Sequence, residues 1–420
     1  MRELLSSFDS LRERPFRLLW MGRTLSSVGD ALVPVATTFA VLDLGDASDL
    51  GLVLGAYMTS RMLFVVVGGD HHQLAREPVR PDAADVVRAV VQAVIALAFF
   101  TDMIAVWQLA LSSAVFGIAS AFFGPASTGL VPQLVTPGRL QEANALLGLS
   151  RNAIEIFGPA VSGILVATVG YGIVFAIDSA SFVASFACLV GIRLPSRIRQ
   201  PERKGFLTEA RDGLREVLAR RWLVVTLCCD AVTNLTLAVY FVLGPVVVAE
   251  HFGGVTDWGL MMTAGAVGGL AGGALVLRFK PARPLFAAYV ILIACPLQLA
   301  ALAVPAVLPV LMVGAALLVL SIVAGNTFWE TMEQQYIPNE SLSRVDSISW
   351  MVSLIAMPLG YAVAGPISDA VGVTTTLLAA AALSAVSLAT ALAMPSVREL
   401  RRLDLPALTP AAPVGATSHD

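Results

Sequence analysis

The stretch WLVVTLCCDAVTNLTLAVYFVLGPVVVAEHFGGVTDWGLMMTAGAVGGLAGGALVLRFKPAR (222–283) decides the fold class. It holds two apolar segments, 222–249 and 257–278, and each has about the 20 residues that a helix needs to cross a bilayer. The connector between them has no Lys or Arg, whereas the next connector carries Arg278, Lys280 and Arg283. Basic residues beside a span resist crossing the membrane, so the second connector is predicted to be cytoplasmic.

The same alternation runs along the whole chain. Connectors without Lys or Arg are 43–50, 100–105, 168–172, 250–257, 304–309 and 369–373. The connectors between them are basic, with Arg76 and Arg80; Arg139; the block 193–221; Arg278, Lys280 and Arg283; and Arg344. Both ends of the chain are basic as well. A period of two predicts an even number of spans with both termini cytoplasmic.

Composition favours a membrane protein over a soluble one. The chain is 57% hydrophobic and 14% charged, with a mean hydropathy of +0.78, whereas soluble domains carry about 25% charged residues. We expect an all-α polytopic membrane protein with twelve transmembrane helices in two six-helix bundles. The expected helices are 17–42, 50–69, 84–101, 104–124, 144–168, 171–193, 222–249, 257–278, 284–303, 308–331, 345–368 and 372–395.

The expected domains follow from this pattern. Residues 1–193 form an N-terminal bundle, 194–221 a cytoplasmic linker on the membrane, 222–395 a C-terminal bundle and 396–420 a disordered cytoplasmic tail. The linker is predicted to contain an amphipathic helix, in which Leu207, Leu214, Val217 and Leu218 share a face.

The two halves echo each other at constant offset. Gly158, Gly163 and Gly170 correspond in spacing to Gly360, Gly365 and Gly372. Each half is therefore expected to derive from one six-helix unit, a plan in which transporters place the substrate site between the repeats near the midplane. On the helix expected at 257–278, Gly265, Gly269 and Gly273 have the small-residue spacing that lets helices pack closely.

Several stretches carry a family resemblance. They are FRLLWMGRTLSSVGDAL (16–32), SAFFGPASTGLVPQLVTPGRLQEANALLGLSRN (120–152), FGPAVSGILVATVG (157–170), FAIDSASFVASF (175–186) and FWETMEQQYIP (328–338). The chain resembles the major facilitator superfamily, and within it the drug, macrolide and siderophore exporters called transmembrane secretion effectors. The resemblance implies two bundles that rock around a cavity formed by helices 1, 4, 7 and 10. Gly158, Pro159 and Gly163 resemble the antiporter motif of its fifth helix.

The gating loop departs from that family. In GGDHHQLAREPVRPDAADVVRA (68–89), Gly68, Gly69, Asp85 and Arg88 keep the family register, but Gln73 stands where an aspartate that locks the cytoplasmic side belongs. A naturally weakened lock and a compensated reading-frame slip both account for it.

Charged residues inside spans are costly, so each is a candidate functional residue. Asp30 is the first proton-coupling candidate, because it lies near the middle of helix 1 on one stripe with Arg23 and Ser27. A carboxyl facing an intermittently wet cavity binds a proton when desolvated and releases it when hydrated. The alternative is a structural carboxylate paired with an arginine of another helix.

Other coupling and substrate candidates follow. Glu155 is a coupling candidate, although a pair with Arg151 four residues earlier is a sufficient structural account. Asp230 is a further coupling candidate, and Asp178 is assigned a structural role because the resemblance makes helix 6 peripheral. Residues that we expect to line the substrate cavity are Arg23, Ser27, Asn234, Tyr240, Asn326, Trp329 and Glu330.

These features predict a proton-coupled exporter of an amphipathic compound, such as an antibiotic, a macrolide-like product or a siderophore, in a bacterial cytoplasmic membrane. We expect a monomer that needs no cofactor beyond the proton gradient and that contacts its substrate and the lipid bilayer. We expect neither a metal site nor nucleic-acid binding, because the histidines are scattered and the basic residues are spread along one membrane face. The alternatives are an importer or facilitator, a degenerate transporter that acts as a binding or scaffold protein, and a membrane enzyme, which no catalytic cluster supports.

If Gln73 weakens the cytoplasmic lock, Gln73→Asp changes the rate of transport, because an acid at this position restores the family's interaction between the halves. The measurement is initial transport rate in energised vesicles, with Gln73→Asn as the uncharged control. Equal rates for all three proteins contradict the gating role.

Overall fold

The described part of the chain is helical. The computed structural model describes residues 9–74, 81–128, 131–192, 206–305 and 307–403. The long helices of the first half are α2 (Arg14–Leu44), α3 (Ala47–Leu74), α4 (Pro81–Phe100), α5 (Val106–Thr128), α7 (Leu140–Val169) and α8 (Tyr171–Val190). Short elements lie at Asp9–Arg12, at α6 (Val131–Leu134) and at Pro137–Arg139.

The second half repeats this layout. After α9 (Phe206–Leu218) it contains α10 (Arg221–His251), α11 (Val255–Arg278), α12 (Pro284–Ile291), α13 (Ala294–Ala303), α14 (Leu308–Tyr336), α15 (Asn339–Leu354), α16 (Ala356–Val371), α17 (Val373–Ala393) and α18 (Pro395–Arg398). Each expected helix overlaps one of these elements or a consecutive pair of them.

Among the described residues, nine segments are long and apolar enough to cross a membrane. They are α2, α7, α8, α10, α11, α12 with α13, α14, most of α15 with α16, and α17. The remaining long helices, α3, α4 and α5, pack beside α2 and α8 in the first half. The chain is therefore a multi-pass membrane protein.

Two predicted spans are interrupted at prolines. Pro296 has no N–H to donate to the carbonyl of Leu292, and the helix is interrupted between α12 and α13. The N–H of Cys295 donates instead to the carbonyl of Leu292, three residues earlier, at an N···O distance of 2.9 Å. Pro358 likewise cannot donate to Leu354, where α15 ends.

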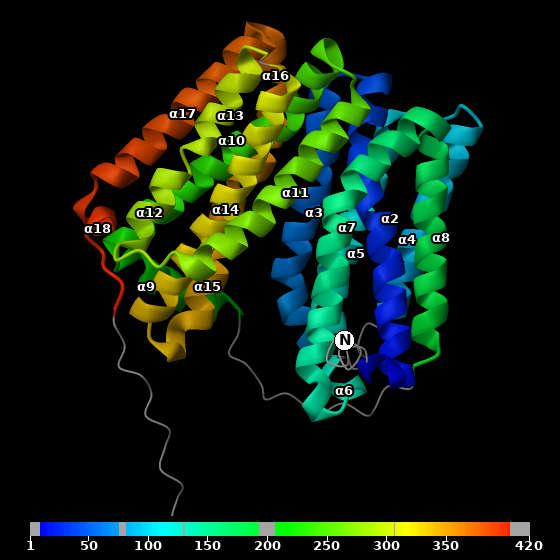
Figure 1. Ribbon diagram of the computed structural model, residues 1–420, viewed down its shortest axis with the longest axis horizontal. Helices are drawn as coiled ribbons and strands as arrows, with labels where there is room; N and C mark the ends of the chain where they lie inside the picture. The colour runs from blue at the N-terminus through cyan, green and yellow to red at the C-terminus, as the bar shows by residue number, and fades with distance from the viewer. Residues whose placement is uncertain (1–8, 75–80, 129–130, 193–205, 306, 404–420) are drawn as a thin grey trace, which may run out of the picture.

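The packing within each half follows one scheme. In the first half α2 packs on α7 and α8, α4 on α5 and α8, and α3 on α5. In the second half α10 packs on α16 and α17, α12 with α13 on α14 and α17, and α11 on α14. Figure 1 shows the two bundles side by side, with the blue-to-green half on the right and the green-to-red half on the left.

Among the connectors that the structure describes, those with and those without basic residues lie at opposite ends of the bundles. At the end without them, which we call the bare end, Ser48 Oγ donates to Asp369 Oδ2 (3.0 Å) and the Tyr171 hydroxyl donates to Asp43 (2.5 Å). At the other, basic end, Arg139 pairs with Glu13 at 3.4 Å, and the Arg402 N–H donates to the carbonyl of Ala282 at 3.0 Å. The alternation in sequence therefore corresponds to two physical faces.

The matched glycines make equivalent helix contacts and turns in the two halves. A Cβ on Gly158 would meet Ala31 of α2, and one on Gly360 would meet Ala238 of α10. One on Gly163 would meet the backbone of Val255 in the other bundle. Gly365 corresponds to Gly163, and a Cβ on it would meet the backbone of Ser48 in the first bundle. Gly170 and Gly372 turn the chain between helices at φ of 82° and 89°, a conformation that favours glycine.

The contacts that join the two bundles run from mid-helix to the bare end. Helix α7 packs on α11, where the Ala160 N–H donates to Thr263 Oγ1 at 3.2 Å. Helix α3 packs on α16, where Gly51 lies against the backbone of Tyr361. Val35 and Phe39 of α2 belong to the same buried apolar cluster as the core of the second bundle.

The close-packing face of α11 differs in part from the one expected. Gly265 and Gly269 lie against Val319 of α14, as their spacing predicts. Gly268 and Gly272 lie against the backbone of Ala316 and Leu320 of α14, whereas a Cβ on Gly273 would meet nothing within 4 Å. The spacing of small residues identified the right helix, but only the direction of α14 selects the face. The prediction that included Gly273 in this face is therefore wrong.

We expect Gly268→Ala to destabilise the protein, since the added methyl collides with the Ala316 backbone and overpacking costs about 1–3 kcal/mol. Gly273→Ala, in the same helix and with open space around it, is the matched control. Thermal unfolding of the detergent-solubilised protein measures both. A melting temperature for Gly268→Ala equal to that of Gly273→Ala would contradict this packing.

Candidate functional site

The interior of the first bundle contains a ladder of polar side chains between α4 and α8. Asp85, Arg88 and Gln92 on α4 are at most 4% exposed. Their spacing of three and four residues places them on one face. On α8, Asp178, Ser181 and Ser185 have the same spacing, and Asp178 and Ser185 are fully buried.

Hydrogen bonds connect the two stripes in antiparallel order. Gln92 Nε2 donates to Asp178 Oδ2 at 2.7 Å, and Ser185 Oγ donates to Asp85 Oδ2 at 2.6 Å. Ser181 Oγ donates to the backbone carbonyl of Asp178 at 2.7 Å. Buried carboxylates need such donors, because a buried polar group without a partner costs about 1–3 kcal/mol.

Arg88 lies among aromatic rings and the carboxylates. Its guanidinium carbon is 5.1 Å from the ring centre of Phe116 and 5.4 Å from that of Phe182. Its Nη2 donates to Ser120 Oγ at 3.2 Å. Both Asp30 and Asp178 interact electrostatically with Arg88. Cation–π contacts with these two rings and the hydrogen bond to Ser120 therefore stabilise the positive charge of Arg88 inside the bundle.

Asp30 of α2 joins this cluster. It interacts electrostatically with Asp85 as well as Arg88, and Asp178 in turn interacts with Asp30. A glycine makes this approach possible, since a Cβ on Gly29 would collide with the side chains of Asp178 and Ser181. The Oδ1 atom of Asp30 is buried and receives no hydrogen bond from any described group. Asp30 and Asp178 thus both interact with the guanidinium of Arg88, and Asp85 and Asp178 both interact with Asp30.

This grouping brings together three residues to which the sequence gave separate roles. The sequence placed Asp85 and Arg88 in a gating motif and assigned Asp178 a structural role, whereas all three lie in the cluster around Asp30. The signal in the sequence was the polar spacing of three and four residues on both α4 and α8. Gly68, Gly69 and Gln73 belong to α3 by their backbone, but their side chains and residues 75–80 lie outside the described part of the chain.

A second set of charged residues lies on α2 and α7. Arg23 is partly buried and interacts electrostatically with Arg151. Arg151 Nε lies 3.5 Å from Glu155 Oε1, and these side chains are 70% and 60% exposed. Charged groups in spanning helices almost always face a water-filled space or the bundle interior. The exposed pair therefore identifies the side of α7 that faces water rather than lipid.

The antiporter-motif glycines of α7 sit at bundle contacts. Gly158 packs on α2, and the carbonyl of Pro159 lies against Gly259 of α11. Gly163 approaches the first turn of α11. The motif therefore forms the surface on which α7 meets helices of both bundles.

In the second bundle, Asp230 is held by neighbouring polar groups. The Tyr289 hydroxyl donates to Asp230 Oδ1 at 3.5 Å and to the carbonyl of Thr226 at 3.4 Å. Asn234 Nδ2 donates to the Asp230 carbonyl at 2.9 Å, and Trp329 Nε1 donates to Thr226 Oγ1 at 3.2 Å. The predicted residues Asp230, Asn234 and Trp329 thus lie near one another across α10 and α14.

Tyr240, a predicted cavity residue, is buried in the core of the second bundle. It is 2% exposed, and its ring centre lies 5.3 Å from Phe241 and 5.5 Å from Trp258. Asn326 is exposed, and Glu330 is partly exposed. The sequence reading overlooked Glu333, which is 2% exposed and accepts a hydrogen bond from Ser349 Oγ at 3.3 Å. Glu330, Glu333 and Asp346 interact electrostatically with one another. The three-residue spacing of Glu330 and Glu333 was the available signal.

Comparison with known proteins agrees with this architecture. A family described as transmembrane secretion effectors matches residues 5–415. The multidrug efflux pump Tap of Mycobacterium tuberculosis is 28% identical over 406 residues, covering 92% of this chain and 94% of that protein. Macrolide efflux protein A of Streptococcus pyogenes is 23% identical, with coverage of 93% and 97%. A solved bacterial homologue of the iron transporter ferroportin, in an inward-facing state, has a TM-score of 0.68 at 19% identity, with coverage of 90% and 98%.

We expect Arg88→Met to destabilise the protein by about 3–5 kcal/mol, because it leaves buried carboxylates without their cation. Arg88→Met combined with Asp85→Asn should recover part of the loss, since one negative charge is removed with the positive one. Arg151→Met, at an exposed pair, is the control and should cost less than about 1 kcal/mol.

Unfolding of the purified protein in detergent measures all three variants. Equal losses for Arg88→Met and Arg151→Met would show that the cluster does not depend on the buried cation.

Proposed function

The chain belongs to the transmembrane secretion effector family, and we propose that it exports an amphipathic small molecule across a bacterial cytoplasmic membrane in exchange for protons. The family consists of membrane transporters of the major facilitator type rather than enzymes. In this proposal the chain has twelve transmembrane helices, with both termini in the cytoplasm. It acts as a monomer and uses no cofactor other than the proton gradient.

The export direction is supported by the related efflux pumps. Two of them, a multidrug pump and a macrolide pump, match more than nine-tenths of this chain. The proposed cargo is therefore a drug-like or macrolide-like compound. A siderophore is a further candidate cargo.

The proposed working state is open to the cytoplasm. The basic end is assigned to the cytoplasm because arginine-rich connectors resist translocation. The bundle contacts of α7 with α11 and of α3 with α16 run from mid-helix to the bare end. Closure at the bare end and separation at the basic end is the arrangement in which cargo enters from the cytoplasm.

The observation that supports the proton coupling is the grouping of acidic side chains around Asp30 and Arg88. Asp30 and Asp178 both interact with the Arg88 guanidinium, and Asp85 and Asp178 both interact with Asp30. Negative charges close together in an apolar interior disfavour the charged form of each carboxyl group. A proton on Asp30 relieves its repulsion with Asp85 and Asp178, and its buried Oδ1 has no described donor to compete with a proton.

The cycle follows from this electrostatics. When the water-facing side of α2 is hydrated from the cytoplasm, Asp30 releases its proton, and when it faces the outside it takes one up. The Asp178–Gln92 bond holds the neighbouring carboxylate in place, so the cluster changes charge without losing its geometry.

Two other functions remain distinguishable. An importer or facilitator uses the same fold, since a fold does not determine direction. A degenerate transporter would bind cargo without moving it, and the altered gating loop with Gln73 is the feature that favours it.

We expect Asp30→Asn to reduce gradient-driven drug uptake by everted membrane vesicles to the level seen with a protonophore, because the amide cannot carry a proton. Asp178→Asn should lower uptake as well. Glu399→Gln is the matched control, because that carboxylate is exposed and pairs with Arg398 outside the spanning helices.

Normal gradient-driven uptake by Asp30→Asn would refute its coupling role. Uptake by right-side-out rather than everted vesicles would favour import, and binding without uptake would favour the scaffold function.

A further inference from the structure

A side-chain hydrogen bond joins the two bundles at the bare end. Ser48 is the second residue of α3 in the first bundle, and its Oγ donates to Oδ2 of Asp369, near the end of α16 in the second bundle, at 3.0 Å. Gly365, one turn before Asp369, lies against the backbone of Ser48. The positive end of the α3 dipole also favours a carboxylate at this place. The bond therefore exists only while α3 and α16 are in contact.

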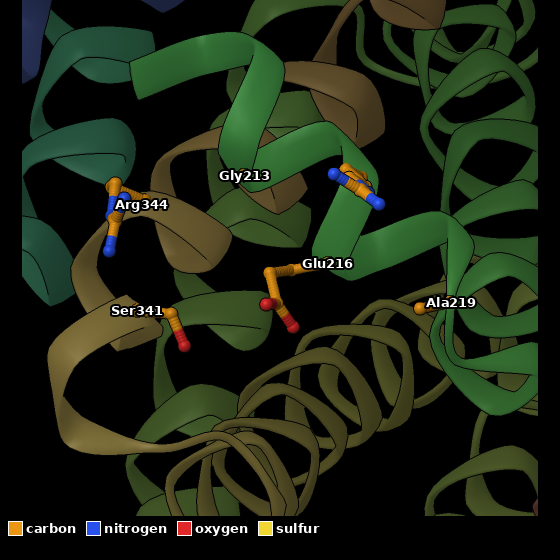
Figure 2. A pocket seen from close by; sticks show the side chains of 6 residues that line it. Gly213, Glu216, Ala219, Ser341 and Arg344 are labelled. Carbon is orange, nitrogen blue, oxygen red and sulfur yellow. The ribbon is translucent and has the colours of Figure 1, made fainter. Parts of the chain in front are cut away.

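The cavity at the basic end, by contrast, lies within one half of the chain. Figure 2 shows Glu216 of α9 and, on α15, Ser341 and Arg344 around it, and α9 packs on α15 and α10. The Ser341 hydroxyl donates to the carbonyl of Pro338, just before α15, at 3.2 Å. These contacts connect elements of the second half, whereas the bond at the bare end connects the two bundles.

The surroundings of Asp369 leave the Ser48 hydroxyl as its partner. Connectors 43–50 and 369–373 at this end contain no Lys or Arg, and Asp369 forms no ion pair with a described residue. Asp46 and Asp49, which flank Ser48 in the sequence, bond to each other's backbone: Asp46 Oδ1 accepts from the Asp49 N–H at 3.0 Å, and Asp49 Oδ2 accepts from the Asp46 N–H at 3.3 Å. The two flanking acids are thus held within their own connector.

The repeat provides an internal comparison for this contact. Gly163 of α7 lies against Thr256 in the first turn of α11, just as Gly365 of α16 lies against Ser48 in the first turn of α3. Thr256 and Ser48 are each the second residue of their helix. The two contacts therefore have the same backbone arrangement and the same type of side-chain donor.

The two contacts differ in the acceptor. At the fourth residue after each glycine, α16 has Asp369 and α7 has Ala167, and both positions are exposed. Alanine has no side-chain acceptor, so Thr256 finds no counterpart of the carboxylate that Ser48 binds. The carboxylate–hydroxyl bond is therefore a property of the contact between α3 and α16.

We propose that the hydrogen bond between Ser48 and Asp369, which we call the latch, holds the bare end closed and sets how often it opens. A bond made in only one of two conformations shifts their equilibrium by its own free energy. The net free energy of one hydrogen bond changes an equilibrium about threefold to tenfold. This inference rests on the alternating movement of the bundles in the proposed function.

The test measures how often the bare end opens. Ala47, the first residue of α3, is 8% exposed and belongs to the buried apolar cluster of the second bundle. A cysteine at this position, in a full chain whose four native cysteines are replaced by alanine, reacts with a maleimide when α3 separates from the second bundle. The labelling rate in nanodiscs, without cargo or proton gradient, reports the open population.

We expect Ser48→Ala and Asp369→Ala each to raise the labelling rate about threefold to tenfold. The double variant should raise it no further, because both substitutions remove the same bond. Asp369→Asn should label like the unchanged protein, since its amide oxygen still accepts a hydrogen bond. Thr256→Ala is the matched control and should leave the rate unchanged.

A second arm builds the bond at the equivalent contact. Ala167→Asp should lower the labelling rate, because it gives Thr256 an acceptor in the position that corresponds to Asp369. The same substitution combined with Thr256→Ala should have no effect.

The proposal is overturned if Ser48→Ala and Asp369→Ala leave the rate unchanged, if their effects add in the double variant, or if Thr256→Ala raises the rate as much. Proton-driven drug uptake is a separate measurement, so a failure of the proposed export and a failure of the latch are distinct results.

Discussion

The cost of a charge in an apolar interior governs this structure. It keeps the arginine-rich connectors at one end of the bundles, because moving them through a membrane is unfavourable. It also means that a guanidinium in the middle of the first bundle needs neighbours that stabilise its charge. Arg88 lies between two aromatic rings, donates to Ser120 and interacts with Asp30 and Asp178. Each of these neighbours lowers the free-energy cost of burying the charge.

Close approach of helix backbones is the second constraint. One pair of matched glycines allows it within each bundle, and the other pair allows it between the bundles. Gly158 and Gly360 bring α7 and α16 against α2 and α10 within their own bundles. Gly163 and Gly365 bring the same helices against the opposite bundle. The paired glycines therefore place the backbones of α7 and α16 close to both bundles.

The candidate site was only partly predictable from the sequence. Asp30 was identifiable because a carboxylate in the middle of an apolar span is costly. Its partners were not, because Asp178 lies 148 positions away and nothing local indicates that α8 turns this face toward α2. The position of Tyr240 was not predictable either, since an aromatic side chain on a membrane helix also packs well in the core, where the structure buries it. The acidic group of Glu330, Glu333 and Asp346 likewise needs the crossing of α14 and α15 to be recognised.

By itself the sequence determined the membrane class, the two opposite faces and the repeat, because these depend on hydropathy, charge and spacing along one chain. The long helices agree with their predicted ranges to within several residues for the same reason. Only the tertiary structure decided which faces meet: Gly268 rather than Gly273 against α14, Asp85 with Ser185, and Val217 but not Leu218 against α15. Hydrophobic periodicity specifies that a face is buried, whereas the rotation and crossing of helices specify its partner, and those are set by packing between segments far apart in the chain.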